Sequence, residues 1–180
     1  RGETDVTANY TFGESVDGVL EITKRTVTLK SADLEKVYDG IALVNGETAL
    51  ETETGWVNGE GANYTFTGSQ MDPNTSANSF EYTLNEGTKA DNYTINKTEG
   101  TLTVTKVETE IIITAASQSR VYNGQALTNA NYTYTENVLA EGDVLTATVE
   151  GTITDYGTEA NKVTGYVVMR GETDVTANYT

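Results

Sequence analysis

The chain opens with the stretch Arg1-Gly2-Glu3-Thr4-Asp5-Val6-Thr7-Ala8-Asn9-Tyr10-Thr11, and the same stretch returns unchanged at residues 170–180. A recurrence at this distance indicates a polypeptide that repeats a structural unit. Two pairs of tyrosines give the length of the unit, because Tyr122 minus Tyr38 is 84 and Tyr166 minus Tyr82 is also 84. The 180 residues therefore predict two similar small domains in series, as part of a tandem array.

The composition is typical of strands. Threonine, valine, isoleucine and 11 tyrosines are frequent, whereas proline occurs once. Apolar and polar residues alternate along residues 25–30 and 101–105, as they do in strands that bury one face. No segment keeps apolar residues at helical spacing over three turns. The sequence therefore predicts a mostly β fold with little or no helix.

Glycine-containing turns separate the expected strands. Tyr38-Asp39-Gly40 and Tyr122-Asn123-Gly124 stand at equivalent places, and each pair of turn residues favours a tight hairpin reversal with positive φ. Further breaks are expected at residues 45–46, 58–61, 85–87, 141–143 and 169–171. Strands of five to eight residues, roughly, fit between them.

Aligning the chain with itself gives the register of the repeat. The matching segments are 26–29 with 110–113, 37–40 with 121–124, 60–61 with 141–142, 81–84 with 165–168, and 90–94 with 176–180. The segment Gly100–Lys106 has its counterpart only in Gly18–Lys24, at the opposite end of the chain. We therefore expect residues 1–23 to be the last strand segment of a preceding module, 24–106 a complete module, and 107–180 a module without its final strand.

The two partial modules are complementary. Residues 107–180 should leave open the place of a closing strand, and the strand of residues 12–24 should have no module of its own. We expect residues 12–24 to fill that place in another copy, head to tail, besides the contacts that neighbouring repeats make with each other. Such a contact gives an open fibre or a closed ring.

The net charge of −16 at pH 7 repels phosphate backbones and anionic lipid surfaces, so nucleic acid and membranes are not expected partners. The chain has no histidine and no cysteine. The commonest general base and nucleophile and the usual zinc and haem ligands are therefore absent, and neither a cofactor nor a metal is expected. A carboxylate pair could still act as in glycosidases. However, Glu60 and Glu141 each precede a glycine at the same place in their modules, and a turn shared by the two modules explains both glutamates without catalysis. No enzyme activity is expected.

Several residues remain candidates for other sites. An aromatic set could stack on sugar rings; it comprises Trp56, Tyr64, Phe66, Tyr132 and Tyr134. Core packing is the favoured interpretation for Trp56 and Phe66, and Tyr38 and Tyr122 are expected to pack over their own turns. No calcium-binding loop of alternating aspartates is present. Five Asn-Tyr-Thr triplets are formal glycosylation acceptors and more simply a recurrent strand-end motif, at Asn9, Asn63, Asn92, Asn131 and Asn178. Lys24 and Lys106 are conceivable donors for a Lys–Asn isopeptide bond.

These segments together resemble the MBG, or "mostly beta grasp", repeat. The resemblance lies in residues 121–127, the Glu-Gly-Asp segment at 141–143, Gly151, Gly157-Thr158, the segment 174–179 and the strand 18–23. Residues 24–106 depart from it, with Ala62 in place of the aspartate and Lys89-Ala90-Asp91-Asn92-Tyr93 in place of the Asp-Val-Thr segment. The resemblance implies β-grasp-like or β-sandwich-like modules of large bacterial surface proteins, extracellular, adhesin-like and often anchored to the cell wall.

Two functions are compatible with these observations. The main expectation is a structural spacer or stalk, because modules that touch chiefly their neighbours add length one unit at a time. The alternative is an adhesion module that binds a host glycan or protein. No residue of the sequence identifies a ligand.

Overall fold

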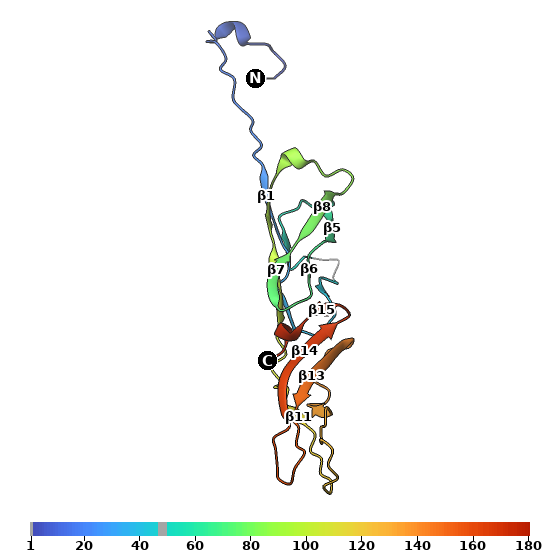
Figure 1. Cartoon of the computed structure of the whole chain (residues 1–180). Helices are drawn as coiled ribbons and strands as arrows, with labels where there is room; N and C mark the ends of the chain where they lie inside the picture. The colour runs from blue at the N-terminus through green and yellow to red at the C-terminus, as the bar shows by residue number, and fades with distance from the viewer. Residues whose placement is uncertain (1, 47–49) are drawn as a thin grey trace.

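The structure, a computed structural model, describes residues 2–46 and 50–180, and it is mostly β. The helical segments of the described residues are three 3₁₀ turns of 3 residues each, η1 (Thr7–Asn9), η2 (Ala90–Asn92) and η3 (Thr176–Asn178). The molecule is elongated (Figure 1): an extended N-terminal segment leaves one end, and the C terminus lies near the middle. The expected mostly β fold is confirmed.

Two bent strand pairs form the frame of the first module. β1 (Arg25–Lys30) pairs in parallel with β9 (Tyr93–Thr98), and β2 (Leu34–Val37) pairs in parallel with β10 (Gly100–Thr105). The strands expected at residues 25–30 and 101–105 are therefore confirmed, the second beginning one residue earlier.

Antiparallel strands flank this frame. β4 (Thr52–Thr54) pairs with β1, and β7 (Asn74–Asn78) pairs with β10. Two further antiparallel pairs are β3 (Leu43–Val44) with β6 (Ser69–Gln70) and β5 (Ala62–Phe66) with β8 (Phe80–Leu84). β10 is thus the central strand of the sheet β2-β10-β7.

The frame bends where β1 passes into β2 beside the start of β10. The buried Ser31 hydroxyl donates to the Asn78 carbonyl at 2.6 Å and accepts from the Gly100 amide at 2.9 Å. The Asn78 side-chain amide donates to the Ala32 carbonyl at 2.8 Å. A Cβ on residue 100 would lie 2.3 Å from that carbonyl oxygen, so glycine is required for the close approach of these backbones.

We predict that Gly100→Ala destabilises the first module by about 1–3 kcal/mol, because the backbone must shift to admit the methyl group. The measurement is urea unfolding followed by the fluorescence of Trp56. Gly18→Ala is the matched control, since Gly18 occupies the corresponding position in the N-terminal segment and a Cβ there meets nothing within 4 Å. Equal stability of Gly100→Ala and the parent chain would contradict the packing described.

The second module is built from antiparallel strand pairs. β11 (Ile113–Ala115) pairs with β12 (Tyr132–Tyr134), and β13 (Asp143–Glu150), β14 (Lys162–Arg170) and β15 (Thr173–Asp174) form an antiparallel sheet. The register of β13 against β14 shifts between Thr148 and Val149, which leaves Thr164 as an additional residue on β14. Because of this bulge, equivalent residues of the two modules are 83 positions apart in β13, as Tyr64 and Ala147 are, and 84 apart in β14 after the bulge, as Tyr82 and Tyr166 are.

The turns match between modules, but they are not hairpins. Gly40 and Gly124 have φ of 78° and 74°, and the Asp39 and Asn123 side chains accept from the amides of Ile41 and Gln125. The positive φ is confirmed. The hairpin interpretation is wrong: the turn at Gly40 joins β2 to β3, but β2 pairs with β10 and β3 pairs with β6. Strands distant in sequence therefore take the place of the neighbour that a hairpin would supply.

The buried side chains form two clusters. One lies wholly in the first module, around Val27, Leu29, Phe80 and Tyr93. The other joins Tyr38 and Val104 of the first module to residues of the second, namely Leu145, Val168, Val175 and Tyr179. The two modules therefore lie in series but share one core at their junction.

The N-terminal segment, residues 2–24, is exposed throughout and contains no strand. Its first part nevertheless has the local structure of the C-terminal copy. Asp5 accepts from the Thr7 amide at 2.9 Å and hydroxyl at 2.6 Å, as Asp174 does from Thr176 at the same distances. Arg1 lies outside the described residues. Within the described part of the chain, no helix is long and apolar enough to cross a membrane.

Candidate functional site: the joint between the modules

A buried carboxylate lies at the centre of the junction. The side chain of Asp143, at the start of β13, is 0% exposed, and its Oδ1 lies 2.7 Å from Nε of Arg170. Its Oδ2 accepts from the Tyr179 hydroxyl at 2.5 Å and from the Tyr38 hydroxyl at 3.2 Å. Because Tyr38 belongs to the first module, this one carboxylate receives donors from both modules.

Arg170 of the second module also bonds directly to the first module. Its guanidinium donates from Nη1 to the Gly40 carbonyl at 2.6 Å and from Nη2 to the Glu141 carbonyl at 3.3 Å. It also lies over the ring of Tyr38, 5.2 Å from the centroid. A Cβ on residue 40 would overlap this guanidinium, so Gly40 is required here both for its positive φ and for space.

Apolar and amide contacts complete the joint. The rings of Tyr38 and Tyr179 meet edge to face with centroids 5.7 Å apart. The Asn178 amide donates to Asp72 Oδ1 of the first module at 2.9 Å. Only Lys106 separates the end of β10 from Val107, which forms a parallel bridge with Tyr179. A one-residue connection beside a shared core restricts rotation of one module against the other.

The joint tyrosines are held in their neutral form. Burial raises the pKa of Tyr38, and burial together with the hydrogen bond to Asp143 raises the pKa of Tyr179. Both phenols therefore donate to the carboxylate throughout the neutral range.

We predict that stability falls as the pH rises above about 10, where tyrosines of the unfolded chain ionise. The folded chain keeps Tyr38 and Tyr179 protonated, so it binds more protons than the unfolded chain there, and the free energy of unfolding decreases with pH. Urea unfolding at a series of pH values measures this. The double variant Tyr38→Phe/Tyr179→Phe should show a shallower alkaline decline, and an equal slope would contradict the assignment.

We further predict that Asp143→Ala lowers the stability of the second module by about 3 kcal/mol, because the Arg170 charge loses its partner. Hydrogen exchange of the β13 and β14 amides should become roughly 100-fold faster. Glu141→Ala is the control, since that side chain is exposed two residues away. Unchanged protection in Asp143→Ala would show that the carboxylate does not hold the joint.

The first module carries a related pair at its opposite end. The Tyr93 hydroxyl donates to Glu60 and accepts from the Val57 amide, as Tyr179 donates to Asp143 and accepts from the Ala140 amide. The structure therefore aligns Glu60 with Asp143, and the sequence match of Glu60 with Glu141 is wrong by two residues. The two glutamates are not brought together: Glu60 binds Tyr93, and Glu141 contributes its carbonyl to the joint.

The aromatic candidates for sugar stacking are largely used inside the modules. Trp56 meets Tyr93 edge to face at 4.9 Å, and both Tyr64 and Phe66 pack on Phe80. Tyr132 is half-buried and donates to the Leu145 carbonyl, whereas Tyr134 is 37% exposed. Packing of Trp56 and Phe66 in a core is confirmed. Tyr38 packs in the joint and not over its own turn, and Tyr122 is 67% exposed.

The remaining candidates concern metal binding, glycosylation and crosslinking. Among the residues that the structure describes, no group of three or more acids could hold a metal ion. Three of the Asn-Tyr-Thr asparagines end 3₁₀ turns: Asn9, Asn92 and Asn178. Lys24 and Lys106 are exposed, and a Lys–Asn isopeptide bond stays a prediction.

Sequence reasoning did not identify the joint residues Asp143, Arg170 and Tyr179 as a set. One signal for this set was available: both modules have a tyrosine at the same place, Tyr93 and Tyr179, and each donates a hydrogen bond to an acid. Arg170 has no such signal, because the register of β8 and β14 places Glu86 at the equivalent position of the first module.

Comparison with known proteins adds no identification: no family model, no curated protein and no solved structure matches the chain.

Proposed function

We propose that this chain is a load-transmitting spacer, a pair of stalk modules of a bacterial cell-surface protein of the adhesin type, without catalytic activity. The observation that carries the proposal is the shared core of the joint, in which Tyr38 and Val104 of one module pack with Val168 and Tyr179 of the next. A flexible linker would leave each module with its own core and its own orientation.

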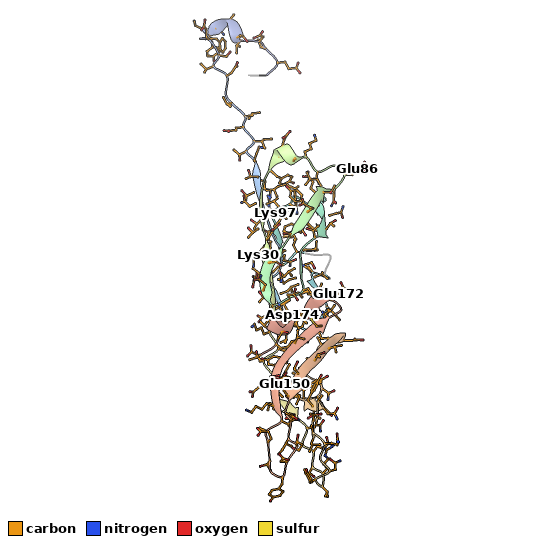
Figure 2. All side chains as sticks on the ribbon, viewed as in Figure 1. Lys30, Glu86, Lys97, Glu150, Glu172 and Asp174 are labelled. Atoms are coloured by element: carbon orange, nitrogen blue, oxygen red, sulfur yellow. The ribbon has the colours of Figure 1, made fainter. Side chains whose placement is uncertain are left out.

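Charge and sequence support the same role. A net charge of −16 over an elongated body keeps parallel stalks apart through repulsion. Acidic side chains are distributed along the length of the molecule, as Glu86, Glu150 and Glu172 show in Figure 2. The resemblance to MBG repeats supports an extracellular location at a bacterial surface. The binding-module alternative has weaker support, because its aromatic candidates are largely packed within the modules.

We predict a narrow distribution of distances between the two modules. Because the chain has no cysteine, spin labels can be attached specifically at Thr83→Cys and Thr146→Cys, which lie on exposed strand positions of β8 and β13. Pulsed electron resonance, with excess unlabelled chain to suppress intermolecular distances, should give one narrow peak. A broad distribution would contradict a stiff spacer.

The matched variants test the joint itself. Tyr38→Ala/Asp72→Ala removes two contacts across the joint and should broaden the peak. Tyr122→Ala/Asp155→Ala changes the equivalent, exposed residues of the second module and should leave the peak unchanged. A glycan array with saturable binding would instead favour the adhesion module.

A further inference from the structure

The second module has an open groove at the place that β10 occupies in the first. There β10 lies between β2 and β7. In the second module the equivalent segments are residues 118–121 and 157–161, neither of which forms a strand. A cavity of about 320 Å³ lies between them, lined by Gln118, Arg120, Tyr122, Tyr156 and Glu159 among others.

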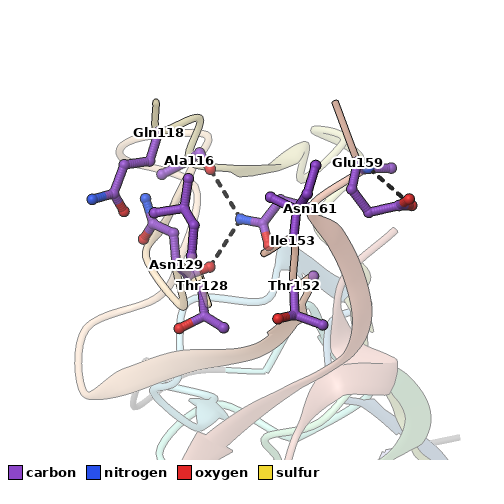
Figure 3. A pocket seen from close by; sticks show the side chains of 11 residues that line it. Ala116, Gln118, Thr128, Asn129, Thr152, Ile153, Glu159 and Asn161 are labelled. Carbon is purple, nitrogen blue, oxygen red and sulfur yellow. Dashed lines mark hydrogen bonds between the residues drawn. The ribbon is translucent and has the colours of Figure 1, made fainter. Parts of the chain in front are cut away.

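One wall of this groove already has the arrangement found in the complete module. The Asn161 side-chain amide donates to the carbonyls of Ala116 and Asn129, at 2.9 and 2.8 Å (Figure 3). Asn78 of the first module makes the corresponding bond to the Ala32 carbonyl, beside the entry of β10. The polar contacts at this end of the groove are therefore in place before a strand arrives.

A second, apolar cavity of about 260 Å³ lies beside the C terminus and is lined by Ile111, Ile113, Leu145, Tyr166 and Val168 among others. Tyr179 and Thr180 also border it. In the first module, the residue two positions after the equivalent Tyr93 is Ile95, which packs against the core. The cavity is thus the place for an apolar side chain two residues beyond Tyr179.

The N-terminal segment carries the side chains that fit both places. Phe12, two residues after Tyr10, is 72% exposed. Leu20 and Ile22 are 102% and 100% exposed, while the residues that follow them by 82 positions, Leu102 and Val104, are 0% and 2% exposed. The chain therefore displays in water an apolar pattern that is fully buried when the same pattern forms β10.

We propose that copies of this chain associate head to tail, with residues 12–24 of one copy inserting into the second module of the next. Phe12 fills the apolar cavity beside Thr180, and the strand of residues 18–23 pairs between residues 118–121 and 157–161 of its partner. Gly18 then lies against the carbonyls of residues 115 and 116, as Gly100 lies against those of Ser31 and Ala32.

The two ends also match in part at the joint surface. Tyr122 and Asp155 are exposed at the far end of the second module, equivalent to Tyr38 and Asp72. At the other end of the chain, Glu60 bonds to Tyr93 and stands where Asp143 does, and Asn92 is exposed in the place of Asn178. Tyr122 can therefore donate to Glu60, and Asn92 to Asp155. Because Glu86 replaces Arg170, this joint lacks the guanidinium, and the strand supplies most of the attachment.

Residues 1–11 are not needed in such a contact. Their place is already occupied by the identical residues 170–180 of the receiving copy. With residues 1–180 alone, each copy offers one donor strand and one receiving groove, so the association continues to an open filament or closes to a ring. The proposal stands on the groove and the segment alone and does not depend on the spacer function.

The test measures mass against concentration by sedimentation velocity on the chain of residues 1–180. We expect species larger than the monomer as the concentration rises toward millimolar, and more of them at higher salt, because screening weakens the repulsion between acidic copies. Deleting residues 1–24 removes only the exposed segment and should give a monomer. A monomeric parent chain at its highest soluble concentration would overturn the proposal.

A peptide of residues 12–24 makes the test specific. Labelled with a fluorophore, it should bind the chain that lacks residues 1–24 at one site, and the Gly18→Ala peptide should bind about tenfold more weakly or worse. Appending a copy of residues 12–24 after Thr180 should fill the groove within one chain, abolishing both peptide binding and association. Equal binding of the parent, Gly18→Ala and scrambled peptides would overturn it.

Gly18→Ala in the whole chain separates assembly from folding. It should leave the stability of the monomer unchanged, since nothing lies within 4 Å of the added Cβ, yet it should weaken association by about the same factor as it weakens peptide binding. Association of this variant equal to that of the parent chain would contradict the strand register. The distance between the two spin labels, measured in labelled chain mixed with excess unlabelled chain, does not depend on whether copies associate. A failure of the association proposal and a failure of the spacer proposal are therefore distinguishable.

Discussion

The first module depends on the parallel pairing of its first strands with its last. β1 and β2 bind β9 and β10, some seventy residues further along the chain, so a module is complete only when its final strand returns to its beginning. Parallel neighbours require such long connections, because the chain must return to the same end of the sheet before the second strand begins. β10 is the extreme case, because it is the middle strand of its sheet and hydrogen-bonds on both edges.

The same arrangement explains how modules combine. A single residue, Lys106, separates the end of β10 from Val107 of the second module, so the strand that closes one core also leads into the next. Val104, near its end, is 2% exposed because it packs in the cluster that both modules share. Asp143 then fixes the relative orientation of the two modules, which apolar contact alone does not do. Its buried carboxylate has its hydrogen-bonding and charged partners only when Tyr38, Tyr179 and Arg170 all lie against it.

Much of the local structure follows from the residues alone. The alternation at residues 25–30 and 101–105 and the positive φ of Gly40 and Gly124 were readable from pattern and turn chemistry. The strand or side chain that each segment contacts could not be predicted in this way. The turn at Asp39-Gly40 favours a hairpin, and the sequence around Glu60 matches that around Glu141, because short-range similarity does not report which distant strand or acid a segment meets. The joint network was missed for the same reason, since Arg170 acts across the junction on Gly40.

The duplicated stretch separates the two levels directly. In both copies Thr-Ala-Asn forms the same 3₁₀ turn after a valine, with φ and ψ of −114° and 12° at Val6 and −117° and 16° at Val175, although one copy is exposed and the other packs in a core. The sequence determines that turn because its hydrogen bonds span two or three residues. The strand pattern of residues 18–23 forms no strand, whereas the same pattern at residues 100–105 does. A strand takes its hydrogen bonds from a neighbouring backbone, so only the tertiary structure decides whether it exists.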